Sequence, residues 1–399
     1  MTDLIRSLQH THAGREPERL QLKYRAMRSN PFVFLRGTCA LFYQRLPVKG
    51  VFRSAPLAWS CGDLHFENFG SYKADNGLVY FDINDFDEAV LAPLSWDLVR
   101  FLASVLVAAR TLSISKPEAG ALCKEFISAY ATALATGKSR WIERDTAQGL
   151  VRALLDDLRG RKRADFLDTR TEHKGKRRRL RIDGRKALPA TIAQQRAVRK
   201  LMRTFAATQP NPAFYKVRDI ARRIAGTGSL GVERYVILVE GKGSPDGNVL
   251  LDLKQALPAS LLDVLEVAQP PWKNDARRTV MLQQRLQAIP MAFLHPVRMG
   301  KQHFILRGLQ PSEDRVTLDR AHQSMPQLQQ VMREMGNLLA WAHLRGAGRA
   351  GSANADALVA YGQRQDWQAP LIARARASAV QVRKDWQAYR SAYDAGVFT

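Results

Sequence analysis

The stretch of sequence that decides the fold reads Cys61-Gly-Asp-Leu-His-Phe-Glu-Asn-Phe-Gly70, and Val79-Tyr-Phe-Asp-Ile-Asn-Asp-Phe-Asp-Glu88 follows it. In the first segment the carboxylate of Asp63 and the amide of Asn68 stand five residues apart. In the second segment a strand pattern leads to Asp85. Phosphoryl transfer needs a carboxylate that orients or deprotonates the acceptor hydroxyl, and oxygen ligands for the Mg²⁺ that bridges the nucleotide phosphates. The two segments therefore offer Asp63 as a candidate carboxylate and Asn68 and Asp85 as candidate oxygen ligands.

This spacing resembles the aminoglycoside-phosphotransferase branch of the protein-kinase-like fold. The pattern of that branch runs His-Gly-Asp-x-His-x-x-Asn, then Ile-Asp at a strand end, then Asp-Leu-Ala on a helix. Asp97, in Trp96-Asp-Leu98, fits the last piece and lies twelve residues beyond Asp85. The resemblance implies that Asp63 and His65 belong to the catalytic loop, with Asp63 as the catalytic carboxylate, and we favour a supporting role for His65. It also implies that the metal ligands are Asn68 and Asp85. We expect Asp97 to act as an anchor, because a carboxylate at a helix start commonly receives buried N–H groups.

The N-terminal stretch is similar to a bacterial family called domain of unknown function 2252. That family carries Ser-Pro-Phe-x-Phe-x-Arg-Gly, Gly-Asp-x-His-x-x-Asn-Phe-Gly and Phe-Asp-x-Asn-Asp-Phe-Asp-Glu. Ser29-Asn-Pro-Phe-Val-Phe-Leu-Arg-Gly37 matches the first pattern with one inserted residue, which makes Arg36 a further candidate. In the third pattern Asp82 and Asp87 compete with Asp85 for the metal, so a second carboxylate contact stays open.

A second constellation, Gly226-Thr-Gly-Ser-Leu-Gly231, precedes strand patterns over 232–240 and 249–254. A dinucleotide-binding site would need a helix directly after the glycines, and a strand follows them here. A glycine-rich loop inside a β-hairpin is the arrangement that covers ATP phosphates in kinases. An ordinary hairpin with a solvent-facing lysine is the alternative. The kinase-like interpretation assigns phosphate binding to Gly226, Thr227, Gly228, Ser229, Gly231 and Lys254.

Lys254 has no clear carboxylate partner in the sequence, and Glu266 is the nearest candidate. We expect the adenine to lie between the hairpin and a strand that ends near Arg307. One triphosphate must then bridge Lys254 and Asp85, so both are expected to line the same cleft.

The motifs occur in an unusual order, because the glycine loop follows the catalytic and metal-binding segments. Chain order need not follow spatial order if the termini lie at a surface loop. Met332–Gly346 resembles the helix that leads into a kinase catalytic loop, yet no such loop follows it. We therefore expect an α+β, protein-kinase-like fold of two lobes, circularly permuted and with additional helices. In the competing account Phe34–Leu46 supplies the preceding helix and the C-terminal helices are an addition.

Three parts are expected: 1–205 as a helical lobe with the catalytic and metal-binding loops and a basic segment, 206–315 as a β-rich nucleotide-binding lobe, and 316–399 as C-terminal helices on the helical lobe. The expected activity is Mg²⁺- and ATP-dependent phosphoryl transfer to a small-molecule hydroxyl or a protein. Nucleotidyl transfer is an alternative that uses the same residues. A nucleotide-binding pseudokinase or a basic nucleic-acid-binding protein without catalysis is the alternative from another class.

The composition is that of a globular protein, with 46% apolar and 25% charged residues. A net charge of +24 favours polyanionic partners. Part of the excess lies in Arg159–Lys186, where thirteen Lys and Arg face four Asp and Glu. We favour a solvated hairpin there over a nucleic-acid site, because few aromatic side chains interleave the charges. Arg177, Arg178 and Arg179 are expected to attract an acidic partner.

The sequence predicts a cytoplasmic protein. Its three cysteines are widely spaced, which favours reduced thiols. The most apolar stretch, Leu98–Ala109, contains Arg100 and is too short to cross a bilayer. The N-terminus lacks the layout of a secretory signal.

Overall fold

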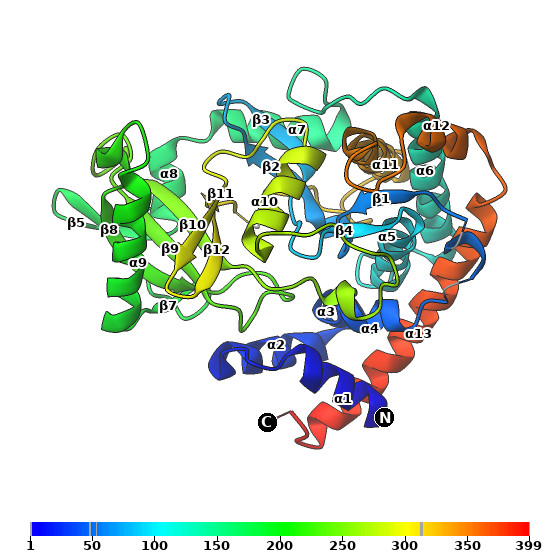
Figure 1. The fold of residues 1–399 in the computed structure, drawn as a ribbon, viewed down its shortest axis with the longest axis horizontal. Coiled ribbons are helices and arrows are strands. Elements are labelled where there is room, and N and C mark those ends of the chain that lie inside the picture. Colours follow the sequence, from blue (N-terminus) through cyan, green and yellow to red (C-terminus); the bar gives the residue numbers. More distant parts are fainter. Residues whose placement is uncertain (1, 48, 53, 312–313, 399) are drawn as a thin grey trace.

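The computed structural model describes residues 2–47, 49–52, 54–311 and 314–398. Two parts lie side by side, one built on a six-stranded sheet and the other on long helices (Figure 1). The mixture of helix and antiparallel sheet confirms the expected α+β class.

The six-stranded sheet is antiparallel throughout, in the order β11-β12-β10-β9-β8-β7. Side chains alternate between its faces, so Tyr235, Leu251 and Leu253 pack with helix α9 (Ile192–Ala206) on one face. Lys254 therefore lies on the other face, which is the face that meets the helical part. The strands are β7 (Ala187–Pro189), β8 (Val217–Arg223), β9 (Arg234–Val239), β10 (Val249–Gln255), β11 (His295–Met299) and β12 (Gln302–Gly308).

The helical part is organised around α5, nearly all of whose residues are buried. Helix α13 packs along α5, and α11 packs along α6, so the C-terminal helices pack on the helical part. Two short antiparallel ladders, β1 with β4 and β2 with β3, carry the loops of the site. The elements are β1 (Leu57–Ser60), β2 (Phe69–Lys73), β3 (Val79–Ile83), β4 (Val90–Pro93), α5 (Ser95–Ala108), α6 (Lys116–Thr136), α7 (Gly149–Gly160), α11 (Met325–Gly346), α12 (Ala355–Gln363) and α13 (Gln368–Asp394).

The sheet part begins earlier in the chain than the boundary expected at residue 206. Strand β7 and helix α9 both precede that residue and belong to the sheet part. Leu167 of α8 (Arg163–Asp168) and Leu180 of β6 (Arg177–Leu180) pack on the second face of the sheet. The basic segment therefore belongs with the sheet.

The single helix expected over 34–46 is two short helices, α3 (Pro31–Gly37) and α4 (Cys39–Gln44). The chain leaves the helical conformation at Thr38, whose ψ is 50° and whose hydroxyl donates to the Phe34 carbonyl at 2.8 Å. This segment therefore does not form the long helix of the competing account.

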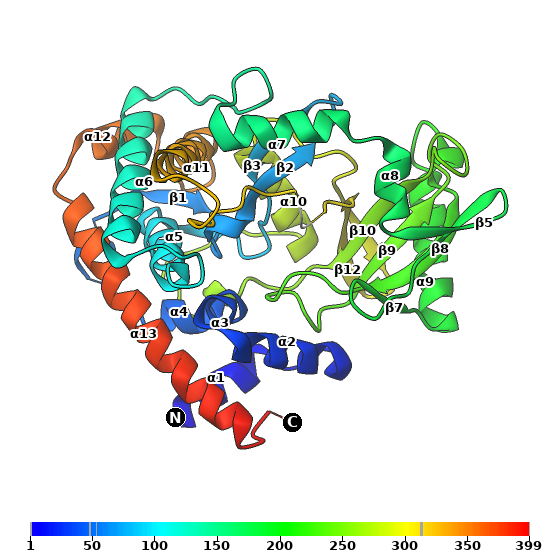
Figure 2. The ribbon, with the colours of Figure 1, turned by 180° about the vertical axis from the view of Figure 1, so that it is seen from behind.

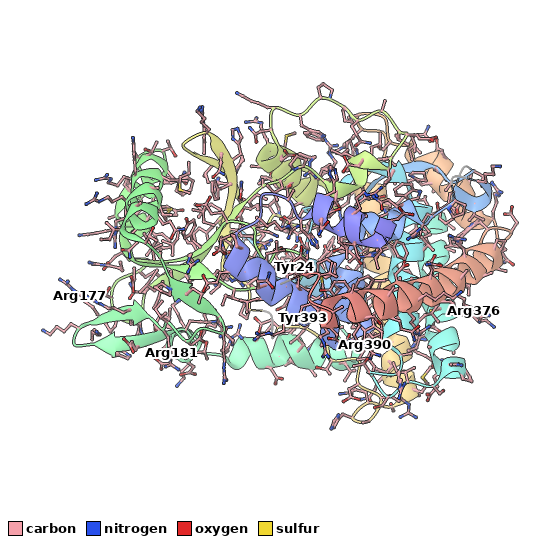
Figure 3. All side chains as sticks on the ribbon, turned by 90° about the horizontal axis from the view of Figure 1, so that it is seen from below. Tyr24, Arg177, Arg181, Arg376, Arg390 and Tyr393 are labelled. Atoms are coloured by element: carbon pink, nitrogen blue, oxygen red, sulfur yellow. The ribbon has the colours of Figure 1, made fainter. Side chains whose placement is uncertain are left out.

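The basic hairpin consists of β5 (Thr171–Lys174) and β6, and its tip projects from the sheet part, as the position of Arg177 in Figure 3 shows. The expectation that Arg178 is exposed is wrong. Burial alternates along β6, so Arg178 points inward and pairs with Asp168 and with Asp246 at 2.6 Å. Arg177 and Arg179 are exposed as expected.

Three further helices connect the parts. Helix α10 (Asp275–Leu286) packs against β12 and α11. Helices α1 (Thr2–Thr11) and α2 (Pro17–Ser29) run along one edge of the molecule, from the helical part toward the sheet (Figure 2). Among the described helices, none has the length and apolar character that a membrane span requires.

Candidate functional site

A cavity of about 130 Å³ lies where the sheet part meets the helical part. Its walls come from the loops after β1 and β3, from the glycine loop with β10, and from α1, α2 and α3. The cleft expected to hold both Lys254 and Asp85 is therefore confirmed. The sequence-predicted residues that line it are Arg36, Asp63, Asp85, Asp87, Gly228, Ser229 and Lys254.

The loop that carries Asp63 is fixed through its backbone. Asp97, in the first turn of α5, accepts hydrogen bonds from the N–H groups of Cys61 at 2.8 Å and Gly62 at 3.0 Å. The anchoring role predicted for Asp97 is confirmed. Gly62 has a φ of +83°, and a Cβ atom built on it would lie 2.1 Å from the Glu88 carbonyl oxygen. Only glycine fits where the loop that carries Asp63 meets the loop that follows β3.

The two oxygens of the Asp63 carboxylate have different surroundings. Oδ1 accepts from Arg100, from Nη2 at 2.6 Å and from Nε at 3.1 Å. Oδ2 lies beside the glycine loop, 4.0 Å from a Cβ atom built on Gly228. Burial raises the pKa of Asp63, and the Arg100 charge opposes that rise. One oxygen is thus committed to Arg100, and the other can contact a hydroxyl in the cavity.

Asn68 and His65 lie behind this loop and do not line the cavity. The Asn68 Nδ2 donates to the backbone oxygen of Asp63 at 3.0 Å, which leaves its Oδ1 as the atom able to bind a cation. His65 is buried edge-on against Phe32, and burial lowers its pKa well below the usual value. His65 supports the loop, and its inclusion among the catalytic residues is not matched by its position.

Of the three acidic candidates after β3, two line the cavity. Asp85 lies there, and although burial favours its neutral form, the charges of Lys254 and Arg307 hold its pKa below the usual value. Asp87 also lines the cavity, whereas Asp82 does not. Asp82 is buried and accepts from the N–H groups of Ile83 at 2.8 Å and Ala288 at 3.3 Å, so the structure does not bring it to the cavity with Asp85.

Lys254 pairs with Asp87, and the expectation of Glu266 as its partner is wrong because Glu266 is exposed elsewhere. Arg278 of α10 fixes the partner, since its Nη2 donates to the Asp87 carbonyl at 3.0 Å. Burial lowers the pKa of Lys254 to about 8, although the charge of Asp85 raises it. Lys254 is therefore a buried cation whose charge depends on the acids around it.

Arg36 and Arg307 were secondary candidates, and only Arg36 lines the cavity. Arg36 pairs with Glu67 at 2.6 Å. Arg307 pairs with Asp252 of β10 at 3.4 Å and donates to the Asn84 carbonyl, also at 3.4 Å. Its charge acts on the pKa values of Asp85 and Lys254.

The glycine loop joins β8 to β9 as a series of turns. The N–H groups of Ser229 and Leu230 donate within the loop, to Gly226 at 3.2 Å and Thr227 at 3.4 Å. Across the described ranges no acceptor is found for the N–H groups of Thr227 and Gly228, which are thus free to bind an anion. Of the loop's predicted ligands, only Gly228 and Ser229 reach the cavity wall.

The donor set near Asp85 suits Mg²⁺. Asp85 offers a carboxylate oxygen to the cavity, and the Asn68 Oδ1 lies behind the loop, outside the cavity lining. Mg²⁺ commonly takes one or two such protein ligands together with phosphate oxygens and water. Within the ranges that the structure describes, no group of three or more His, Cys, Asp or Glu side chains could hold a metal ion. An Mg²⁺ ion beside Asp85 would therefore take its other ligands from phosphate and water.

A family model described as "Uncharacterized protein conserved in bacteria (DUF2252)" matches residues 15–392. The chain belongs to this family. No curated protein and no solved structure matches the chain.

Three charged residues of this family member line the cavity and escaped the sequence analysis. Arg15 lies between α1 and α2 and Lys23 lies on α2, where no motif marks them. Glu88 closes the segment 79–88, and its Oε2 accepts from the Ser260 N–H at 2.6 Å. A fourth residue, Arg100, lies behind Asp63 and could have been found, since a charge inside an apolar helix needs a buried partner.

Proposed function

We propose that the protein is an Mg²⁺- and ATP-dependent phosphotransferase. The observation that carries this proposal is the shared cavity, into which Asp63, Asp85, Gly228 and Lys254 converge from distant parts of the chain. Convergence of a carboxylate base candidate, oxygen ligands, free loop N–H groups and a lysine is what phosphoryl transfer requires.

Each group has a separate task in the proposed reaction. Asp63 orients the acceptor hydroxyl and takes its proton through Oδ2, while Arg100 holds Oδ1 in place. Asn68 and Asp85 would hold Mg²⁺, which neutralises phosphate charge when bound. Lys254 would contact phosphate oxygens after the nucleotide displaces Asp87 as the partner of its ammonium group.

A permuted kinase-like fold is part of the proposal, and the position of α11 supports it. This helix ends beside β1, the strand that leads into the catalytic loop: a Cβ atom on Gly346 would lie 3.4 Å from Cβ of Trp59. The Ala353 N–H donates to the Leu57 carbonyl at 2.8 Å. Helix α11 thus has the place of a helix that precedes the loop, although it follows the loop in sequence.

The cavity volume implies a step before nucleotide binding. About 130 Å³ is available, whereas pockets for small molecules commonly measure about 300–1,000 Å³. The cavity is therefore too small for a nucleotide as it stands and must widen, and such loop movement is common among enzymes.

The test uses ATP labelled at the γ- or the α-phosphate, with Mg²⁺ and a panel of small hydroxyl compounds and proteins. We expect transfer of the γ label alone, and loss of transfer in Asp63→Asn. Retention of the α label would show nucleotidyl transfer instead. Absence of any Mg²⁺·ATP-dependent rise in melting temperature would overturn nucleotide binding itself.

We place the protein in the cytoplasm because its three cysteines are free and buried.

A further inference from the structure

The N-terminal segment, which forms one wall of the cavity, holds the glycine loop through hydrogen bonds. Arg15 donates through Nη1 to the carbonyls of Gly228 at 2.6 Å and Leu230 at 2.8 Å. The backbone N–H of Glu16 donates to the Gly231 carbonyl at 2.8 Å. The loop's carbonyls are thereby occupied on the side of α1 and α2.

Lys23 reaches the same loop from α2. Its side chain is buried, with the residue 1% exposed, and Nζ donates to the Gly228 carbonyl at 3.1 Å. That carbonyl is its one hydrogen-bond partner in the described part of the chain. An ammonium group has three donors, and one neutral acceptor satisfies it poorly. Burial and the Arg15 charge accordingly hold the pKa of Lys23 well below its usual value, although the charges of Asp63 and Glu88 raise it. A bound phosphate would favour the charged form.

The cations around the cavity differ in whether a carboxylate neutralises them. Arg36 pairs with Glu67, and Lys254 pairs with Asp87. Arg15 and Lys23 form no ion pair with any described residue, although both line the cavity. They are the cations that an incoming anion could bind without first breaking an ion pair.

We propose that Arg15 and Lys23 bind the terminal phosphates of a nucleotide, and that α1–α2 is a polyphosphate-binding element of the site. Both residues donate to the Gly228 carbonyl. Gly228 lies beside the Asp63 carboxylate, since a Cβ atom built on it would be 4.0 Å from Asp63 Oδ2. Arg15 and Lys23 therefore lie at the end of the cavity where the acceptor and the terminal phosphate would meet. The inference rests on the proposed phosphotransferase function and names the residues that sense its substrate.

The exchange of partners also explains how the narrow cavity widens. Charge-assisted hydrogen bonds to phosphate are stronger than bonds to neutral carbonyls. A polyphosphate therefore draws Arg15 and Lys23 away from Gly228 and Leu230 and releases the loop. The nucleotide removes the contacts that keep it out.

The test compares Lys23→Met with Lys23→Arg, and uses Arg25→Gln, an exposed arginine on the same helix, as the matched control. Binding of ATP, adenosine and inorganic tripolyphosphate is measured by calorimetry, and melting temperatures are recorded. We expect Lys23→Met to weaken ATP and tripolyphosphate binding at least tenfold and to leave adenosine binding unchanged. Lys23→Arg should retain most of the affinity, and Arg25→Gln should match the wild type.

Other outcomes overturn the inference in distinguishable ways. Wild-type affinity for tripolyphosphate in Lys23→Met, or equal loss of adenosine and ATP binding, would show that Lys23 only supports the fold. Arg15→Gln repeats the comparison if Lys23→Met does not fold, since Arg15 is only partly buried. A wild-type protein that binds neither ATP nor tripolyphosphate would instead remove the phosphotransferase proposal and this inference together.

Discussion

The two walls of the cavity are built differently. The early wall, residues 61–88, is fixed by buried backbone contacts: Asp97 binds two of its N–H groups and Arg100 holds Asp63. The late wall, the glycine loop 226–231, bonds within its own turns and to side chains of the N-terminal segment. The early wall thus depends on its own core, and the late wall depends on contacts that a ligand can replace.

This difference suits the two tasks of a phosphotransferase site. Groups that act on developing charge work best when they are preorganised in the folded protein. Groups that admit a substrate must move. The comparison predicts that changes in the early wall alter stability and the chemical step, whereas changes in the late wall alter affinity.

The largest contrast is expected between two glycine substitutions. Gly62→Ala places a Cβ atom 2.1 Å from the Glu88 carbonyl oxygen at a positive φ, whereas Gly228→Ala places one 3.3 Å from the Arg36 carbonyl oxygen. We expect Gly62→Ala to reduce the free energy of unfolding by about 3–5 kcal/mol, and Gly228→Ala by less than about 1 kcal/mol. Urea denaturation measures both. Equal losses would contradict the distinction between the walls.

The second contrast separates chemistry from metal binding within the early wall. Asp63→Asn should leave Mg²⁺·ATP affinity largely intact and slow transfer by roughly 10²–10³, since about 2–4 kcal/mol of transition-state stabilisation is lost with one preorganised contact. Asp85→Asn should remove the metal dependence of nucleotide binding. Asparagine is preferred to alanine at Asp63 because Arg100 is fully buried and needs an acceptor. A similar fall in nucleotide affinity in both variants would refute the separate roles.

The sequence predicted the early wall better than the late wall, for a physical reason. Asp97 stands at the start of a helix that packs beneath the nearby loop, and it accepts from the N–H groups of Cys61 and Gly62. The short sequence motif around Asp97 was therefore enough to predict this contact. The partnership of Lys254 with Asp87 depends on how two parts of the chain meet, and no local pattern encodes it. Sequence reasoning therefore chose Glu266 by proximity in the chain.

The other differences have equally specific causes. Arg15 and Lys23 lie in an unremarkable helical segment, so only the packing of that segment on the glycine loop reveals them. Arg178 could have been identified, because the expected strand alternates in burial and turns every second side chain inward.

A third prediction concerns the charge of Lys254. Its pKa is about 8 in the free protein because burial disfavours the ammonium form, and bound phosphate would raise that pKa again. ATP binding therefore takes up a proton above pH 8, and affinity should fall by about tenfold per pH unit there. Calorimetry at pH 7, 8, 9 and 10 measures the slope.

Lys254→Arg is the control for this dependence, because guanidinium stays protonated over that range. The variant should lose the part of the slope that Lys254 contributes, whatever its affinity at pH 7. Any slope that remains belongs to Lys23, whose pKa burial also lowers well below the usual value. The free energy of unfolding depends on pH in the opposite direction from ATP affinity. The folded protein releases the Lys254 proton at a lower pH than the unfolded chain does, so the protein becomes more stable as the pH rises from about 8 to about 10.5. A wild-type affinity that is flat between pH 8 and pH 10 would show that Lys254 does not contact the phosphates.

The smallest effect is expected outside both walls, on the basic hairpin. Arg177 and Arg179 are exposed, and exposed charges act mainly by long-range attraction that salt screens. The double variant Arg177→Gln/Arg179→Gln should elute from an immobilised heparin column at a lower salt concentration, and its Kd for ATP should stay within about twofold of the wild type.

Arg178 is left out of this variant because it is buried and pairs with Asp168 and Asp246, and its removal would break both ion pairs. Arg178→Gln should therefore reduce stability while the exposed pair does not. A large, salt-independent loss of ATP affinity in the double variant would connect the hairpin to the cavity and would contradict the separation of surface attraction from nucleotide binding.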